Sequence, residues 1–198
     1  AGDAGGALGA ALAVWYMHYN KNRNQNISND QMYGSYLGPE YSNDEIEREL
    51  IKFGAKFTKF KTKDLIKKTV DALIDESAIG WMQGRMEFGP RALGSRSIIA
   101  DARSSVMQRQ LNLKVKYRES FRPFAPSILR EDLNNWFDIN IDSPYMLFVA
   151  NLKDEQKTQL DIKNSLTLNK IRSTIPAVTH VDYSARVQTV NDTNGKFY

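Results

Sequence analysis

The sequence contains no cysteine and only two histidines, His18 and His180. The absence of cysteine excludes disulfide bonds, zinc sites built on thiolates and catalysis by a thiol, and it fits a reducing compartment, so we predict a cytoplasmic protein. Two histidines are too few for a histidine-rich metal site made by this chain alone. The phosphate loop Gly-x-x-x-x-Gly-Lys-Ser/Thr, the zinc motif His-Glu-x-x-His and the nucleophile elbow Gly-x-Ser-x-Gly are also missing from the sequence.

The sequence also lacks a long hydrophobic run. The apolar stretch from Ala7 to Met17 is too short to cross a bilayer. The first residues, Ala1-Gly-Asp-Ala-Gly, do not have the basic leader of a signal peptide. We therefore expect no contact with a membrane.

Positive charge is present, and it is concentrated in one segment. The chain has 198 residues and a formal net charge of +4. Between residues 85 and 122 there are nine Lys and Arg against three acids, a local charge of +6, so the rest of the chain has a charge of −2. A concentrated basic segment is typical of a site for a polyanionic ligand, and a solvated basic face is the competing interpretation.

The order of predicted elements favours a mixed α/β (α+β) chain. Ser42-Asn-Asp-Glu45 is a capping box that predicts a helix with Ile46, Leu50 and Phe53 on one face, ended at Gly54. Other helices are predicted after a glycine-rich turn within 3–19, and over 64–76, 104–113 and 131–137. Strands are predicted over 78–83 (buried), 97–100, 124–129, 145–150, 175–180 and 186–190, loops over 20–30 and 154–169, and a domain boundary near 56–63.

The segment Gly84 to Ser97 is the strongest candidate for an anion-binding loop. Three arginines alternate there with residues that fix the backbone, and two serines add hydroxyl groups. Guanidinium groups can hold phosphate or carboxylate with two parallel hydrogen bonds. The candidate ligands and loop residues are Arg85, Gly89, Pro90, Arg91, Gly94, Ser95, Arg96 and Ser97.

A second basic cluster follows closely in the sequence. Lys116, Arg118, Ser120 and Arg122 occupy alternating positions, so an extended chain would place all four on one face. The two clusters could then form two walls of a nucleotide pocket. The competing interpretation is that some of the arginines pair with Glu87, Asp101 or Glu119, although three acids cannot neutralise nine bases.

Four further residues lie outside these clusters. His180 belongs to the polar group Thr179-His-Val-Asp-Tyr-Ser-Ala-Arg186, where a role in binding and a structural role are equally supported, and Arg186 adds a cation there. His18 follows the apolar stretch of a predicted helix and is expected to pack against it. Asp3 either caps that helix or is one ligand of a metal or phosphate site completed by residues outside this chain.

Together these motifs resemble the NodU/CmcH family of O-carbamoyltransferases. The resemblance covers most of the chain, and its central motif is long and specific. It rests on Gly2-Asp-Ala-Gly-Gly-Ala-Leu-Gly-Ala-Ala-Leu12, Tyr36-Leu-Gly-Pro39, Gly80-Trp-Met-Gln-Gly-Arg-Met-Glu-Phe-Gly-Pro-Arg-Ala-Leu-Gly94, residues 107–126, Thr179-His-Val-Asp182 and Ala185-Arg-Val-Gln-Thr-Val190. Tyr183-Ser184 departs from the family, which commonly has Gly-Thr there.

The resemblance implies an O-carbamoyltransferase as the full-length protein. It implies that residues 1–60 are the end of an actin-like ATPase-type domain, whose metal, a divalent ion or iron, would have Asp3 as a ligand. Residues 61–198 would be most of a YrdC-like domain, a mixed sheet with flanking helices. That domain would bind ATP, with Mg²⁺, and carbamoyl phosphate, form a carbamoyl adenylate and supply the carbamoyl group to a hydroxyl of a sugar or natural product.

On this basis Arg91, Lys116 and Arg118 are the predicted catalytic residues, and the other candidates, with His180 and Arg186, hold substrate or nucleotide. We expect the sequence to be an excised fragment of a larger enzyme, with its activity as a fragment left open, as are the acceptor, the identity of the metal and the oligomeric state. Two other interpretations remain: a tRNA-binding YrdC-like module and an inert interaction domain. The first is disfavoured because the sequence shows no groove-reading helix and no aromatic stacking platform.

Overall fold

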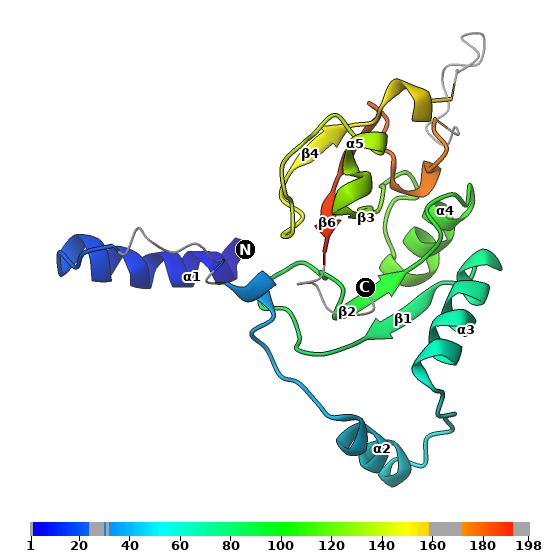
Figure 1. Cartoon of the computed structure of the whole chain (residues 1–198), viewed down its shortest axis with the longest axis horizontal. Helices are drawn as coiled ribbons and strands as arrows, with labels where there is room; N and C mark the ends of the chain where they lie inside the picture. The colour runs from blue at the N-terminus through cyan, green and yellow to red at the C-terminus, as the bar shows by residue number, and fades with distance from the viewer. Residues whose placement is uncertain (1, 24–29, 31, 159–171, 192–198) are drawn as a thin grey trace. The chain divides into compact units, whose positions relative to one another are not determined.

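The structure of the chain is a computed structural model, and it describes residues 2–23, 30, 32–158 and 172–191, residues 2–4 by their backbone only. The chain divides into two compact units: unit 1 is Ala1–Thr58 with Met82–Ser97, and unit 2 is Lys59–Trp81 with Ile98–Tyr198. The described part contains five α-helices and six strands, so the chain is mixed α/β as predicted (Figure 1). The predicted domain boundary at residue 60 stays a prediction.

Unit 1 begins with helix α1, Gly2–Ala13, which continues into a π-helical turn, Val14–His18. The predicted glycine-rich turn is wrong, because the helix starts at Gly2 and includes the glycines. The alanines and leucines between them are strong helix formers, which offsets the helix-weakening effect of glycine. Asp3 therefore lies within the first helical turn, and its side chain is outside the described residues.

Helix α2, Asn43–Lys52, follows its predicted capping box. The hydroxyl of Ser42 accepts a hydrogen bond from the Glu45 amide at 3.3 Å, and a carboxylate oxygen of Glu45 accepts one from the Ser42 amide at 2.8 Å. The Ser42 hydrogen bonds also lower the pKa of the Glu45 carboxyl. Gly54, at φ +64°, follows the end of the helix in the left-handed conformation that glycine adopts without strain.

Helix α3, Thr62–Ile74, lies within two residues of its predicted range and opens unit 2. Strands β1, Ile79–Met82, and β2, Arg96–Ile99, then form a two-stranded sheet at the predicted places. The burial predicted for the first strand is wrong, since its side chains alternate between half-buried and exposed.

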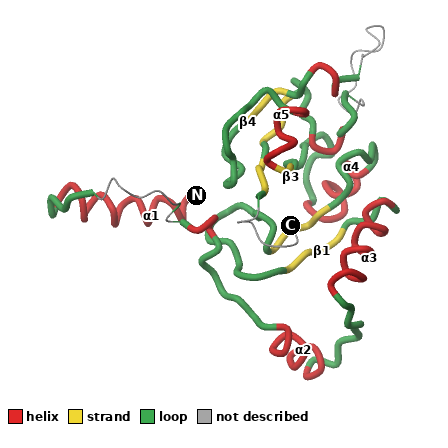
Figure 2. The backbone as a smooth tube through the Cα atoms, in the orientation of Figure 1, coloured by secondary structure: helices red, strands yellow, loops and turns green. Residues whose placement is uncertain are grey.

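The remaining elements of unit 2 are short and separated by loops (Figure 2). They are α4 (Met107–Leu111), β3 (Ser127–Leu129), α5 (Leu133–Trp136), β4 (Val149–Asn151), β5 (Ser184–Arg186) and β6 (Gln188–Val190). Strand β3 runs parallel to β6, and β4 runs antiparallel to β5. Among the described residues each sheet has two strands, and none of them closes.

The main core of unit 2 is formed by buried residues of α5, β4 and β5 and of the segments next to them. Leu133 and Phe137, at and just beyond α5, are almost completely buried and contact Leu152 and Val187. Burying a side chain of this size stabilises a fold by about 1.5–3 kcal/mol. This core positions both ends of the segment that contains His180.

One predicted strand is wrong, and others are shorter than predicted. Residues 175–180 do not form a strand: Pro176–Val178 is a 3₁₀ turn, since proline fixes φ and has no N–H for a strand ladder. The predicted strands over 124–129 and 145–150 overlap β3 and β4 only in part. In the described part of the chain no helix is long and apolar enough to cross a membrane.

Candidate functional site

The Gly84–Ser97 segment of unit 1 is organised around the side chain of Glu87. This side chain is 7% exposed, and its Oε1 accepts hydrogen bonds from the amides of Leu93 and Ser95 at 2.7 Å and of Arg96 at 3.3 Å. Glu87 forms no ion pair with any side chain that the structure describes. Of the three acids named as possible partners for the arginines, Asp101 and Glu119 form such pairs, whereas Glu87 does not, because backbone amides occupy its carboxylate instead.

Two of the three arginines in this segment are held by the protein. Arg96 donates to the carbonyl oxygens of Gln83 and Ser95, at 2.9 and 2.8 Å, and of Gly84 at 3.1 Å. Arg85 donates to the Gly38 carbonyl at 3.1 Å and forms an ion pair with Glu40 at 3.4 Å. Both guanidinium groups thus fasten the loop to its neighbours within unit 1.

The predicted small residues of the loop have two different roles. Gly89 and Gly94 have φ of +134° and +111°, values that favour glycine. Ser95 and Ser97 are buried, and the Ser97 hydroxyl accepts from the Gly94 amide at 3.0 Å. Pro90 lies in the exposed part of the loop. The Ser97 hydroxyl therefore stabilises the loop from inside, and Ser95 is buried in it.

In unit 2 the predicted second cluster folds around Asn112, which is fully buried. Its side-chain amide donates to the carbonyls of Ser120 and Arg122 at 3.2 and 2.7 Å, and its Oδ1 accepts from Nε of Arg118 at 2.6 Å. The condition for one shared polar face, an extended chain over residues 116–122, is not met: Tyr117 is left-handed, at φ 48°, and turns the chain back toward Asn112.

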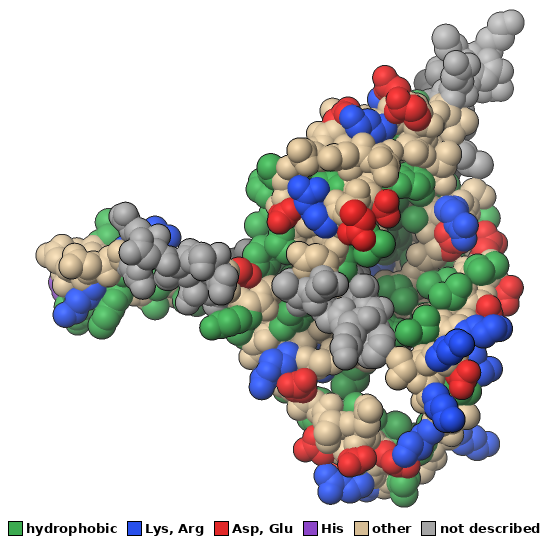
Figure 3. Space-filling model, in the orientation of Figure 1, with side chains coloured by type: hydrophobic (Ala, Val, Ile, Leu, Met, Phe, Trp, Pro, Cys, Tyr) green, Lys and Arg blue, Asp and Glu red, His purple; other side chains and the backbone are tan. Residues whose placement is uncertain are grey.

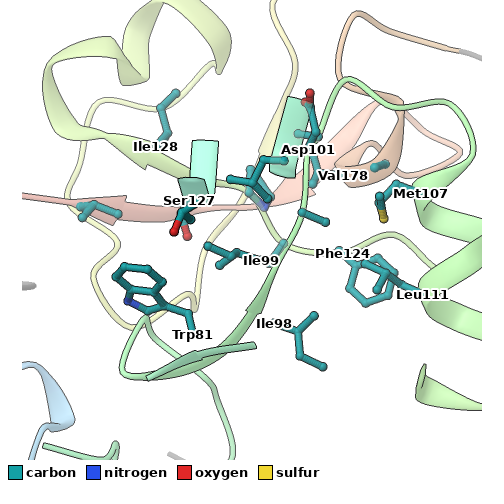
Figure 4. A pocket seen from close by; sticks show the side chains of 18 of the residues that line it. Trp81, Ile98, Ile99, Asp101, Met107, Leu111, Phe124, Ser127, Ile128 and Val178 are labelled. Carbon is teal, nitrogen blue, oxygen red and sulfur yellow. The ribbon is translucent and has the colours of Figure 1, made fainter. Parts of the chain in front are cut away.

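Arg118 is also held by an aromatic ring, since its guanidinium carbon lies 4.9 Å from the ring centre of Phe124. Phe124 lines a cavity of about 450 Å³ in unit 2. Figure 4 shows Trp81, Ile98 and Ile99 with Met107 and Leu111 around this cavity. Its described lining contains no Lys or Arg and only one acid, Asp101, so it suits apolar groups rather than phosphates.

His180 and Asp182 form a pair at the turn before β5. Nδ1 of His180 lies 2.9 Å from Oδ1 of Asp182, and the same oxygen accepts from the Ser184 hydroxyl at 2.6 Å and the Ser184 amide at 3.0 Å. Arg186 ends β5 and is exposed. The side chain of His180 is 42% exposed, so its other ring nitrogen is available for a ligand.

Asp182 makes the stability of this turn depend on pH. Hydrogen bonds from Ser184, and then from His180, lower the pKa of its carboxyl to about 2. A carboxyl whose folded pKa is below its unfolded value stabilises the fold above pH about 4, and that contribution is lost as the pH falls toward about 2. We expect Asp182→Asn to lower the thermal unfolding midpoint at pH 5–7 and to match the parent near pH 2.

The measurement is the unfolding midpoint from pH 2 to 7 for both proteins. Asp75→Asn removes an exposed carboxylate with no hydrogen bond or ion pair among the described residues, so it should leave the shape of the pH profile unchanged. A constant difference between parent and Asp182→Asn across this range would contradict the prediction.

The basic segment contains cations with and without protein partners. Of its nine Lys and Arg, three pair with carboxylates: Arg85, Arg103 with Asp101 and Arg122 with Glu119. Among the described residues no hydrogen bond or ion pair engages the side chains of Arg91, Arg109, Lys114 and Lys116, all of them exposed. Two of these four, Arg91 and Lys116, are predicted site residues.

Other cations lie outside this segment. Figure 3 shows Lys and Arg side chains over α3, whose sequence includes Lys63, Lys67 and Lys68. Lys67 pairs with Asp71 at 3.2 Å, whereas Lys63 is exposed with no ion pair among the described residues. Lys63 is therefore a suitable control for charge alone.

A resident metal does not fit the described residues, because no three or more His, Asp or Glu side chains among them cluster closely enough to hold one. The predicted metal ligand, Asp3, has its side chain outside the described part of the chain. His18 is exposed at the end of a π-helical turn rather than packed as predicted, and it contacts the Tyr19 ring edge-on.

Sequence reasoning missed three organising residues: Glu87, Asn112 and Asp182. Two of them could have been found from the sequence, because each is a polar residue inside or beside a motif that was already a candidate site. Glu87 is an acid between glycines in a basic run, and Asp182 is two residues from His180. Asn112 had no such signal, because only the reversal of the chain at Tyr117 brings its partners to it.

Unit 1 contains a loop of interleaved glycines and arginines, and unit 2 contains a second basic turn and a His–Asp pair. Each of these groups is of a kind that can bind an anion. Residues 70–198 match the family described as the carbamoyltransferase C-terminus. The chain belongs to this family, which confirms the predicted resemblance.

Named relatives extend the match over the whole chain. The chain is 49% identical over all of its length to an uncharacterised protein of Synechocystis, and it covers 33% of that protein. It is 38% identical, over 96% of its length, to the nodulation protein NolNO of Sinorhizobium fredii, of which it covers 25%. It is 42% identical, over 62% of its length, to the 3′-hydroxymethylcephem-O-carbamoyltransferase of Streptomyces clavuligerus, of which it covers 20%. The chain thus spans between a fifth and a third of these relatives and is related to O-carbamoyltransferases.

Proposed function

We propose that this chain is the part of an O-carbamoyltransferase that binds carbamoyl phosphate and ATP. In the proposed reaction water cleaves carbamoyl phosphate to carbamate and phosphate, and a carbamate oxygen bonds to the α-phosphorus of ATP as pyrophosphate leaves. The hydroxyl oxygen of a sugar or natural product then bonds to the carbamoyl carbon of this adenylate and loses its proton as AMP leaves. The family match and the name of the Streptomyces relative support the reaction class. A YrdC-like architecture for residues 61–198 is part of the same proposal.

The chemistry requires positive charge more than a nucleophile. Forming a mixed anhydride with phosphate concentrates negative charge on phosphate oxygens, and fixed cations stabilise that charge as it develops. Arg91 and Lys116 would bind phosphate oxygens directly. Arg118, held between Asn112 and Phe124, would orient a phosphate without having to reorganise.

The observation that carries the proposal is the contrast between held and available cations. Arg85 and Arg96 are occupied by the protein, whereas Arg91 is exposed in the same loop without a partner among the described residues. In the second cluster, Arg118 and Arg122 are engaged by Asn112 and Glu119, whereas Lys116 is exposed without a partner among the described residues. Two available cations in two fixed segments favour a phosphorylated ligand over a purely structural role.

Mg²⁺ in this proposal accompanies ATP as part of the substrate, because no described cluster fits a resident ion. A metal bound by Asp3 and residues outside this chain remains part of the proposal for the full-length polypeptide. His180, which precedes β5, and Arg186, which ends it, would complete the binding site for the nucleotide or carbamoyl phosphate.

The test is titration calorimetry with carbamoyl phosphate and with ATP on the full-length polypeptide that carries this chain. We expect Arg91→Ala to weaken the binding of carbamoyl phosphate, and Lys116→Ala to weaken the binding of carbamoyl phosphate or of ATP. Each loss should be about ten- to a hundredfold, the usual effect of losing a hydrogen bond to a charged group. Product formation should fall in parallel.

Lys56→Ala and Lys63→Ala remove the same charge from exposed sites, one in each unit, and should leave binding unchanged. Absence of binding by the folded parent would overturn the proposal. Unchanged product formation in both site variants would favour an inert interaction domain. Binding of tRNA with a steep salt dependence would favour a nucleic-acid-binding module instead.

A further inference from the structure

The buried carboxylate of Glu87 closes a loop whose exposed part contains Arg91. Its Oε1 accepts from the Leu93, Ser95 and Arg96 amides at 2.7, 2.7 and 3.3 Å, so one side-chain oxygen joins the start of the loop to its end. Amide-to-carboxylate distances of 2.7 Å are typical of charge-assisted hydrogen bonds, which are about twice as strong as neutral ones.

Hydrogen bonds with residues outside the 87–96 loop also hold its two ends in place. The Tyr36 hydroxyl donates to the Leu93 carbonyl at 2.7 Å, and the Phe88 amide donates to the Ser35 carbonyl at 2.6 Å. Beyond Gly94, the Ser97 hydroxyl accepts from the Gly94 amide. Both ends of the loop are therefore fixed within unit 1.

Between these fixed ends, residues 89–92 are exposed, and no hydrogen bond among the described residues engages them. Gly89, at φ +134°, starts this stretch, and Arg91 lies in it. The amides of Leu93, Ser95 and Arg96 donate to the Glu87 carboxylate, so they cannot donate to a phosphate at the same time. The backbone amides of residues 89, 91 and 92 and the Arg91 guanidinium remain for an external anion, and the guanidinium is the only charged group among them.

We propose that Glu87 is a positioning residue: it holds the 87–96 loop closed so that the Arg91 guanidinium is presented to the phosphate of the substrate. This inference rests on the proposed function, because it assumes that Arg91 binds a phosphorylated ligand. Glu87 itself does not touch the ligand. Its effect on binding acts entirely through Arg91.

A double-mutant cycle tests this dependence, with carbamoyl phosphate and inorganic phosphate as probes in calorimetry on the full-length polypeptide. We expect Arg91→Ala to weaken binding about ten- to a hundredfold and Glu87→Ala about tenfold. The double variant should bind as weakly as Arg91→Ala alone, because residues that act through each other are not additive. Losses that multiply would overturn the inference.

Glu87→Gln keeps the size and the acceptor oxygen, so it provides the matched variant if Glu87→Ala does not fold. It should weaken binding by about threefold in the parent and have no effect in the Arg91→Ala background, since a neutral acceptor makes a weaker bond. A threefold effect in both backgrounds, or none in the parent, would contradict the proposal.

Hydrogen exchange separates failure of the inference from failure of the proposed function. The amides of Leu93 and Ser95 should exchange slowly in the parent, and at least about tenfold faster in Glu87→Ala than in Glu87→Gln. If the parent binds neither probe but shows this pattern, the proposed function fails and the role of Glu87 in closing the loop stands. Equal exchange in all variants overturns that role whatever the binding data show.

Discussion

Replacing Asn112 with leucine is expected to unfold the 112–122 turn of unit 2 and to abolish turnover. Leucine has the same number and branching of side-chain heavy atoms but cannot hydrogen bond. It therefore leaves the carbonyls of Ser120 and Arg122, and the Nε of Arg118, without their partner. Each buried polar group left unpaired costs about 1–3 kcal/mol, so the expected loss of stability is about 3 kcal/mol.

Asn112→Asp separates the contact with Arg118 from the hydrogen bonds to the carbonyls of Ser120 and Arg122. Aspartate keeps an oxygen for Arg118 but places its second oxygen against two carbonyl oxygens, so we expect the turn to open while the arginine contact survives. Hydrogen exchange across residues 107–124 measures the opening, and product formation measures its consequence. Asn135→Leu changes an exposed asparagine of α5 and should have little effect on either. Protection of the turn in Asn112→Leu equal to that of the parent would contradict this prediction.

Phe137→Ala should produce the largest loss of stability in unit 2. Phe137 is 1% exposed and packs with Leu133, Leu152 and Val187 in the core beneath α5. Removing a buried phenyl group forfeits its transfer free energy and leaves a cavity, which together cost about 3–5 kcal/mol. Because that core also fixes the segment around His180, we expect substrate binding to weaken with the fold.

Urea denaturation followed by tryptophan fluorescence measures this loss, with Trp136 as the neighbouring reporter. Phe148→Ala removes the same side chain from a position that is 46% exposed in the same unit, and it should cost about 1 kcal/mol or less. Equal losses for the two variants would show that the core around Phe137 does not carry the stability of unit 2.

Local signals were enough to predict several elements. The capping box at Ser42 and the helical spacing in α3 fix those helices through residues adjacent in sequence. The predicted strand over 175–180 failed because its apolar run was given more weight than Pro176, whose ring favours a helical turn. Likewise, the alternating polar residues from Lys116 to Arg122 would share a face only in an extended chain, and the left-handed Tyr117 reverses the chain instead.

The sequence by itself determined the family, the basic segment from residue 85 to 122 and the identity of its candidate cations, because these depend on motif and composition. Only the tertiary structure decided which cations are available. Arg85 and Arg96 look equivalent to Arg91 in the Gly84–Ser97 motif, but carbonyls and a carboxylate distant in sequence occupy them. Whether a charged group is satisfied depends on the partners that folding brings within about 3 Å, and sequence spacing does not encode that.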